Sequence, residues 1–136
     1  MSKYIFLFFL AIPLLSCKKT IEKIKENKII DIMVDGQWKI TQFTIDAENR
    51  ITEFANYTFK YHRNKTVDAI ENGIIRFTGA WDGDISLKTT WANFGNIIEP
   101  ISSLNGTWNI TNNTSSYVVL NQTSGGSTKH MRLEKI

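Results

Sequence analysis

Apolar and polar residues alternate with a period of two along most of this chain, and this pattern constrains its fold more than any other feature. The alternation begins at Gln37, and β-branched and aromatic residues occupy many of its apolar positions. Successive side chains of a β-strand point to opposite faces, so each alternating segment is expected to form a strand with one buried face. The eight segments are residues 38–41, 57–62, 65–71, 75–81, 85–89, 108–110, 118–120 and 131–133.

Turn-forming residues separate these segments. Asn72-Gly73 is the dipeptide that a type I′ hairpin favours, and Asp82-Gly83 is of the same kind. Together with Arg63-Asn64 they predict a meander of four consecutive antiparallel strands over residues 56–90. Gly125-Gly126 predicts another turn between the last two strands.

The connections also favour one overall architecture. A meander of eight strands leaves two exposed edges, and closure into a barrel removes both. We therefore expect an all-β fold, an antiparallel up-and-down eight-stranded barrel preceded by a short helix or tether. A two-sheet β-sandwich is the alternative, although its Greek-key crossovers need longer connections than most of these. The stretch 92–106, around Pro100, is expected to form one helical turn or a plug-like loop that ends at Asn105-Gly106.

The start of the chain has the pattern of an export signal. Lys3 is followed by an apolar run over residues 4–15, which suits a secretory signal and is too short to span a bilayer. The run ends in Leu14-Leu15-Ser16-Cys17, which resembles the bacterial lipobox. The resemblance implies that Cys17 receives a diacylglyceryl group, that the chain is cut before it, and that the new amino group is acylated, typically with palmitate.

The chain therefore divides into three parts: a signal peptide over 1–16, a lipidated tether over 17–35 with a short amphipathic helix near 20–33, and a barrel domain over 36–136. Two or three acyl chains hold a protein stably on a membrane, whereas one does not. The residues after Cys17 are neither the aspartate of inner-membrane retention nor an acidic run. They imply a lipid-anchored protein of the outer membrane that faces the periplasm.

Charge and cysteine content narrow the classes of partner. Removing residues 1–16 takes only Lys3 from the 16 basic residues, so 15 basic and 13 acidic residues remain and the net charge is +2. That charge is too weak and too evenly spread for a nucleic-acid partner. Because Cys17 is the chain's one cysteine, the domain is expected to fold without disulfides.

Four short blocks carry a resemblance to a known group of proteins. They are Gly36-Gln37-Trp38-Lys39-Ile40, the run 54–61, Gly79-Ala80-Trp81 and the run 104–110. The run 54–61 resembles the second-strand block, and the other three resemble the Trp-containing strands, of small lipocalin-like lipoproteins that are common in Bacteroidetes such as Flavobacterium. The resemblance implies a barrel fold and an envelope address more than it implies an activity. The chain departs from true lipocalins in being short and in lacking a later basic motif to pair with Trp38.

No set of residues in the sequence assembles a recognisable catalytic site. His62 and His130 alternate with apolar neighbours and are expected to point outward, and Asp82 and Asp84 flank a turn glycine. Phosphate-binding loops, zinc-protease patterns and nucleophile elbows are absent from the sequence. We therefore expect a protein that is not an enzyme and that uses no cofactor or metal.

The apolar faces of the strands define the expected interior. The side chains on these faces are bulky, so we expect them to fill the barrel as a hydrophobic core. The alternative is a modest cavity for an apolar molecule. The inward positions are Trp38, Ile40, Tyr57, Phe59, Tyr61, Val67, Ala69, Ile75, Phe77, Trp81, Ile85, Leu87, Trp108, Ile110, Val118, Leu120, Met131 and Leu133.

Two hypotheses of function follow from this interior. In the first, the barrel binds a small apolar ligand, with Trp91, Phe94, Ile97 and Ile98 near the mouth of its cavity. The candidate ligand-lining residues are Trp38, Tyr57, Phe59, Tyr61, Phe77, Trp81 and Trp108. In the second, a solid barrel docks another envelope protein through the apolar segment 91–104.

Overall fold

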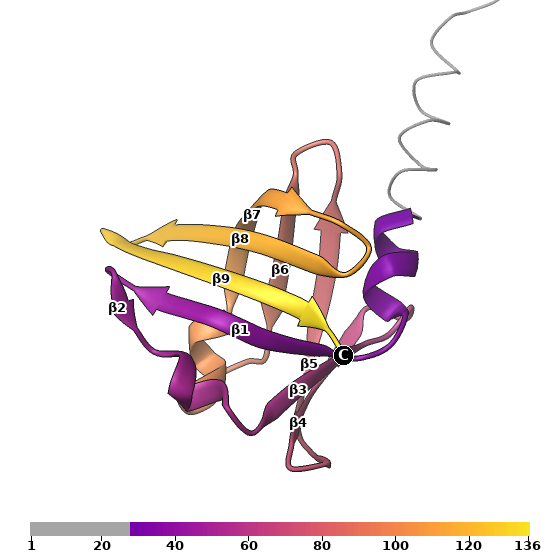
Figure 1. Ribbon diagram of the computed structural model, residues 1–136, viewed down its shortest axis with the longest axis horizontal. Coiled ribbons are helices and arrows are strands. Elements are labelled where there is room, and N and C mark those ends of the chain that lie inside the picture. Colours follow the sequence, from indigo (N-terminus) through magenta and orange to yellow (C-terminus); the bar gives the residue numbers. More distant parts are fainter. Residues whose placement is uncertain (1–27) are drawn as a thin grey trace, which may run out of the picture.

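The expected all-β barrel is confirmed by the computed structural model, which describes residues 28–136 (Figure 1). The expected signal peptide, the expected lipid-bearing Cys17 and the first part of the expected helix lie outside the described residues. The described part forms one antiparallel sheet in the order β2-β1-β3-β4-β5-β6-β7-β8-β9, and β1 also pairs with β9. Its strands are β1 (Trp38–Ile45), β2 (Glu48–Asn49), β3 (Tyr57–Tyr61), β4 (Thr66–Glu71), β5 (Ile74–Asp84), β6 (Thr89–Asn93), β7 (Gly106–Asn113), β8 (Tyr117–Ser124) and β9 (Ser127–Lys135).

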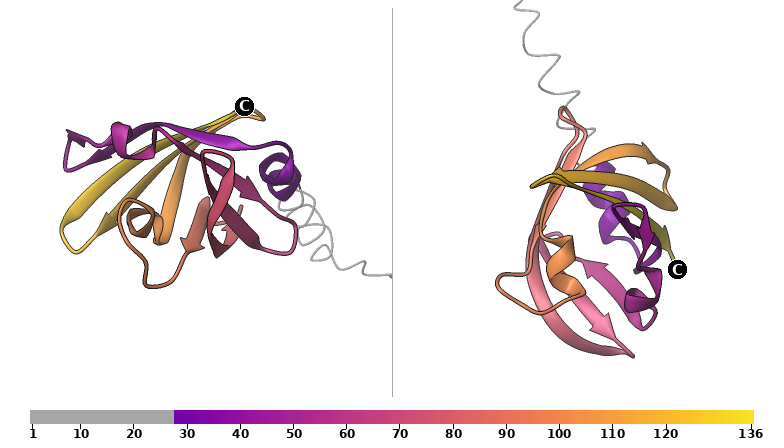
Figure 2. Two further views of the ribbon diagram at one scale, coloured as in Figure 1. Left: turned by 90° about the horizontal axis from the view of Figure 1, so that it is seen from below. Right: turned by 90° about the vertical axis from the view of Figure 1, so that its left-hand side faces the viewer.

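The pairing of the first long strand with the last one closes the barrel. β1 and β9 pair from Trp38 opposite Lys135 to Ile45 opposite Lys129, with a shift of register between Ile40 and Gln42. On its other side β1 meets β3 through Trp38 and Phe59. β2 forms only a two-residue antiparallel hairpin with the end of β1, so the closed barrel has eight strands. The sandwich alternative therefore does not apply, and Figure 2 shows the sheet curving round the core.

Two tight turns have the expected geometry. Asn72 and Gly73 have φ values of 49° and 80°, and Gly125 and Gly126 have φ values of 58° and 79°. Positive φ at both central residues is what a type I′ turn requires. The meander of β3 to β6 is confirmed because each of these strands pairs antiparallel with the next.

The expected turn at Asp82-Gly83 is wrong. β5 continues through this dipeptide, and Gly83 pairs with Thr90 of β6. The Asp82 carboxylate accepts a 2.5 Å hydrogen bond from Lys65 and a 2.8 Å bond from the Gly83 amide, so it is used within the sheet. The chain reverses over residues 85–88, where Asp84 accepts the amide hydrogen bond of the residue three places later.

Two residues that were expected to point inward, Leu87 and Ile75, lie on the surface. The shifted turn explains Leu87, and a bulge explains Ile75. Leu87 falls in the turn and is 70 % exposed. Ile75 is 58 % exposed because the register of β4 and β5 shifts: Ala69 pairs with Phe77, but the next residue, Ile70, pairs with Ile75. This bulge places one extra residue in β5 and turns Ile75 to the outer face.

Three buried tryptophans form the centre of the core, and each indole N–H reaches a backbone carbonyl. Trp38 donates to Met33 at 2.9 Å, Trp81 donates to the His62 carbonyl at 3.0 Å, and Trp108 donates to the Leu104 carbonyl at 2.9 Å. The indoles are therefore buried without leaving a polar group unpaired. Further core residues come from outside the alternating segments: Met33, Phe43, Phe54, Phe94, Ile101 and Leu104.

Short helical segments lie on opposite sides of the barrel. Two 3-10 helices, η1 (Ile51–Phe54) and η2 (Ile101–Leu104), lie on one side, and the helix formed by residues 28–34 lies on the other (Figures 1 and 2). η2 confirms the single helical turn expected within 92–106. No helix in the described part of the chain is long and apolar enough to cross a membrane.

Candidate functional site

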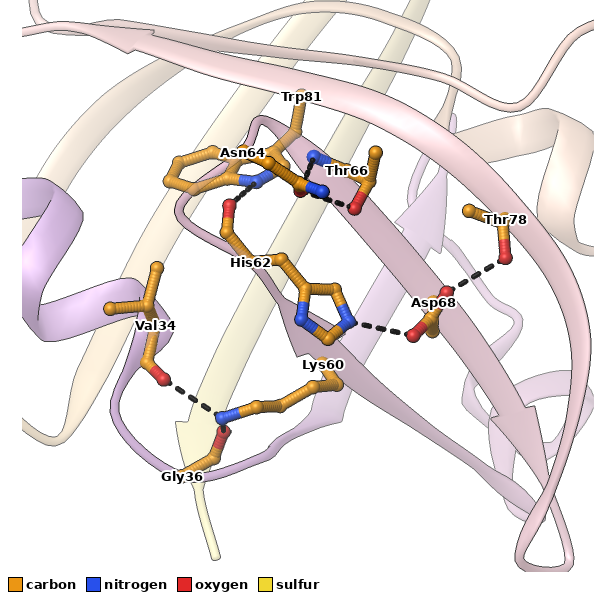
Figure 3. Close-up of polar contacts among 9 residues, drawn as sticks. All are labelled: Val34, Gly36, Lys60, His62, Asn64, Thr66, Asp68, Thr78 and Trp81. Carbon is orange, nitrogen blue, oxygen red and sulfur yellow. Dashed lines mark hydrogen bonds and ion pairs between the residues drawn. The ribbon is translucent and has the colours of Figure 1, made fainter.

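The helix at residues 28–34 forms one wall of the candidate site, and its end is held to the barrel by a lysine. The ammonium group of Lys60 donates hydrogen bonds of 2.8 Å to the Val34 carbonyl and 2.9 Å to the Gly36 carbonyl (Figure 3). Gly36 has a φ of 74°, the left-handed conformation in which helices commonly end. A cation at this position satisfies carbonyls that the helix leaves unpaired.

Further contacts fasten the same helix. The Trp38 indole binds the Met33 carbonyl from inside the barrel. On the surface, the Arg63 guanidinium and the Asp31 carboxylate form an exposed ion pair, with Nη1 and Oδ1 2.7 Å apart. The strong anchors are therefore Trp38 and Lys60, because exposed ion pairs contribute little to stability.

An apolar cavity lies between this helix and the barrel. Its volume is about 50 Å³. None of its lining side chains is charged. The polar side chains in the lining are those of Thr90, Asn113 and Thr114, together with the Tyr61 hydroxyl. We call it the inner cavity, and its lining residues are Ile29, Ile32, Met33, Ile40, Phe59, Tyr61, Trp81, Thr90, Trp91, Ala92, Phe94, Leu104, Trp108, Ile110, Asn113, Thr114, Val118, Leu120, Met131 and Leu133.

The inner cavity contains four of the seven candidate ligand-lining residues, namely Phe59, Tyr61, Trp81 and Trp108. Trp38, Tyr57 and Phe77 lie elsewhere: Trp38 and Tyr57 are buried in the core, and Phe77 is half-buried against it.

Of the four residues expected near the mouth of the cavity, two line the inner cavity and two do not. Trp91 and Phe94 line the cavity, whereas Ile97 and Ile98 do not. Ile98 is 72 % exposed.

The helix residues of the cavity wall are the part that strand patterns could not reveal. Ile29, Ile32 and Met33 recur at helical spacing, which predicts an apolar stripe but not the surface that the stripe covers. Only the folded chain shows that this stripe faces the barrel interior. Gly83 on β5 assists the approach, because a Cβ atom built there would lie 3.8 Å from a methyl carbon of Ile29.

Tyr61 brings a polar group to the wall of the inner cavity. Its ring contacts Trp81 edge-on, with the ring centroids 5.1 Å apart. Burial raises the pKa of the Tyr61 phenol well above its usual value, so the hydroxyl stays neutral at physiological pH.

A second, larger hollow adjoins the inner cavity on the outside. Its volume is about 570 Å³, and we call it the outer groove. It is lined by the turn between β5 and β6, by the end of β7 and by the helix. Its lining residues are Ile29, Ile85, Ser86, Lys88, Ile110, Thr111, Asn112 and Asn113.

The outer face of β3, β4 and β5 carries a polar cluster. The Asp68 carboxylate lies 2.7 Å from His62 Nε2 and accepts a 2.7 Å hydrogen bond from Thr78 (Figure 3). Burial raises the pKa of Asp68, but the bonds from Thr78 and His62 and the His62 charge outweigh it and lower the pKa below its usual value.

Both histidines are engaged by neutral or acidic partners on the surface. His62 Nε2 contacts the Asp68 carboxylate at 2.7 Å. His130 contacts Asn121 at 2.6 Å. Within the described residues, no three His, Cys, Asp or Glu side chains are grouped so that they could hold a metal ion.

Comparison with known proteins gives a match at the level of the fold. No protein-family model and no curated protein sequence matches the chain. The crystal structure of a DUF4847 family protein from Bacteroides vulgatus, a member of the Bacteroidetes, superposes with a TM-score of 0.57. The two sequences are 15 % identical, and the match covers 78 % of this chain and 96 % of that one. At this identity the likeness extends to the barrel fold alone.

Proposed function

We propose that this protein is a lipid-anchored, non-catalytic lipoprotein of the cell envelope that binds the apolar part of a small molecule. The observation that carries the proposal is the inner cavity, which has apolar walls and a neutral phenol. Binding sites for small molecules are typically apolar and contain a few polar groups that orient the ligand. The inner cavity has this chemistry, because Tyr61 and Thr90 contribute to its lining.

The size of the inner cavity limits what it can take. Its volume of about 50 Å³ is well below the roughly 300–1,000 Å³ of typical small-molecule sites. It is also smaller than the cavity of about 150 Å³ that binds benzene in an engineered protein. The inner cavity therefore suits the end of an apolar chain rather than a whole lipid.

Tryptophan fluorescence tests the binding proposal directly, because Trp81, Trp91 and Trp108 line the cavity. Titration with alcohols and acids of medium chain length is expected to give a saturable change. The substitution Ala92→Leu adds a larger side chain to the cavity wall and is expected to weaken binding by about ten-fold, since overpacking costs about 1–3 kcal/mol.

Ala55→Leu is the matched control, because Ala55 is exposed and does not line the cavity. It is expected to bind as the unsubstituted protein does. A titration that never saturates, or equal binding by the Ala92→Leu variant and the control, contradicts the proposal.

The anchor is a separate part of the proposal and rests on the lipobox-like run that ends at Cys17. A membrane-bound protein with a periplasmic barrel is the arrangement that this run supports. Metabolic labelling with palmitate is expected to mark the full-length protein and to leave the Cys17→Ala variant unlabelled. Equal labelling of both proteins, or of neither, contradicts lipidation at Cys17.

A second candidate function is favoured by the exposed apolar residues. Ile74 and Ile75 are each more than half exposed and adjoin the β4–β5 turn, and Leu87 is 70 % exposed in the turn at the other end of β5. The neighbouring side chains of Ile74 and Ile75 suit contact with another envelope protein, and Leu87 offers a separate contact point. Crosslinking in the native envelope is expected to trap that partner, and a crosslink pattern unchanged by Ile75→Ser and Leu87→Ser contradicts this candidate.

A further inference from the structure

We propose that the inner cavity and the outer groove form one binding site for a single-chain amphiphile with an anionic head group. The proposal rests on the binding function proposed above and adds the class of ligand. The end of the apolar chain occupies the inner cavity, and the head group lies in the outer groove beside Lys88.

Three lining residues belong to both hollows, so the two adjoin each other. Ile29 of the helix, Ile110 in the middle of β7 and Asn113 at its end each line the inner cavity and the outer groove. Ile29 and Ile110 are both partly buried, so they form an apolar threshold between the two spaces. A chain that enters over this threshold stays in contact with apolar surface.

The two hollows differ in chemistry in the way that an amphiphile requires. The inner cavity has no charged lining residue, so burial of a charged head group there would be costly. The outer groove, in contrast, is lined by hydroxyl and amide side chains, including Ser86, Thr111 and Asn112. Its volume of about 570 Å³ lies within the usual range for small-molecule sites.

The positive charge of Lys88 in the outer groove favours a negatively charged head group. Lys88 is the one charged residue that lines either hollow, and it forms no ion pair with any residue from 28 to 136. The nearby carboxylate of Asp84 does not line the groove and accepts the amide hydrogen bond of Leu87. An unpaired ammonium group favours an anionic partner such as a carboxylate or a phosphate.

The backbone holds Lys88 at this place. Its amide donates a 3.2 Å hydrogen bond to the Ile85 carbonyl, and its carbonyl accepts a 2.7 Å bond from the amide of Ile110. The residue has a φ of 52°, the left-handed conformation that closes the turn. The second bond ties the turn to the same residue that separates the two hollows, so the lysine stands directly beside the threshold.

Three ligands with the same chain and different head groups test this inference on the full-length protein: decanoate, 1-decanol and decyltrimethylammonium. Affinities are measured by tryptophan fluorescence below the concentration at which each ligand forms micelles. The variant Lys88→Gln removes the charge and keeps much of the length and polarity of the side chain. Lys39→Gln is the matched control, because Lys39 is exposed on β1 and lines neither hollow.

The expected result is a loss that depends on the head group. Lys88→Gln weakens the binding of decanoate by about two- to five-fold, the range for one exposed charge pair, and leaves 1-decanol unchanged. Decyltrimethylammonium binds more weakly than decanoate to the unsubstituted protein. Ala92→Leu weakens all three ligands alike, because it alters only the inner cavity.

The outcomes separate this inference from the function on which it rests. If none of the three ligands binds, the proposed function itself fails. If all three bind and Lys88→Gln changes decanoate and 1-decanol equally or changes neither, the function stands and the assignment of an anionic head group is overturned. That assignment is also overturned if Lys39→Gln has the effect expected of Lys88→Gln.

Discussion

The indole N–H of Trp38 donates a 2.9 Å hydrogen bond to the backbone carbonyl of Met33, within the buried core. This bond joins the first residue of β1 to the end of the helix that covers the inner cavity. One aromatic side chain therefore serves both the packing of the barrel and the attachment of the helix.

Replacing Trp38 with phenylalanine is expected to lower the free energy of unfolding by about 2–4 kcal/mol. The change leaves a cavity and removes the donor from a buried carbonyl. Urea denaturation followed by circular dichroism measures the loss. The same substitution at Trp91, which is 41 % exposed, serves as the control and should change stability far less. Equal losses in the two variants would show that Trp38 has no special structural role.

Lys60→Met is expected to loosen the helix without unfolding the barrel. Methionine keeps most of the apolar stem but cannot bind the carbonyls of Val34 and Gly36. Hydrogen exchange should become faster in residues 28–36 and stay unchanged in β8 and β9. Lys39→Met is the control, and unchanged exchange in residues 28–36 of the Lys60 variant would refute the anchoring role.

Gly79→Ala is expected to cost about 1–3 kcal/mol of stability. A Cβ atom at this position would lie 2.7 Å from the carbonyl oxygen of Asn93 and 2.8 Å from a ring carbon of Phe94. The oxygen belongs to the paired strand β6 and cannot move away easily. Gly83→Ala is the control, because its Cβ would meet nothing closer than 3.8 Å. Thermal unfolding of both variants should separate them, and similar midpoints would argue against the close approach at Gly79.

The Asp68 carboxylate is expected to make the fold sensitive to acid. Its pKa in the folded protein is lowered below the usual 3.8, so its stabilising effect is complete above that value and is lost as the pH falls through the folded pKa. Asp68→Asn should therefore be less stable than the unsubstituted protein at pH 7, by about 1–2 kcal/mol. The difference should shrink below pH 3.8.

Urea titrations at about pH 7 and about pH 3 measure this change. Asp35→Asn is the control, because the Asp35 side chain is 80 % exposed and its ion pair with Lys135 spans 3.3 Å. It should have little effect at either pH. A constant difference between Asp68→Asn and the unsubstituted protein at both pH values would contradict the prediction.

The barrel could be predicted from the sequence because alternation and turn chemistry agree over most of the chain. Asn72-Gly73 and Gly125-Gly126 have the positive φ values that their residue types favour. The prediction of a turn at Asp82-Gly83 was wrong because contacts within the sheet outweighed the local turn preference of the dipeptide. Asp82-Gly83 has the composition of a turn, but the bonds of Asp82 to Lys65 and Gly83 keep the dipeptide in β5.

The candidate site was less predictable, because its walls come from elements that no periodic pattern connects. Alternation placed Phe59, Tyr61, Trp81 and Trp108 on an inward face, and these four do line the inner cavity. It could not show that the helix covers them. The outward turn of Ile75 was equally hidden, because a bulge leaves no mark in the residue pattern.

The pairing of β1 with β9 also has a consequence for the order of events during folding. Residues such as Asp35 and Lys135, which contact each other at the closure, are 100 positions apart in the chain. Contacts this distant form late, because the entropy of closing the intervening loop must be overcome first. Until β9 arrives, one edge of β1 is available to any other extended chain. A chaperone that shields this edge during folding would protect the protein at its most vulnerable stage.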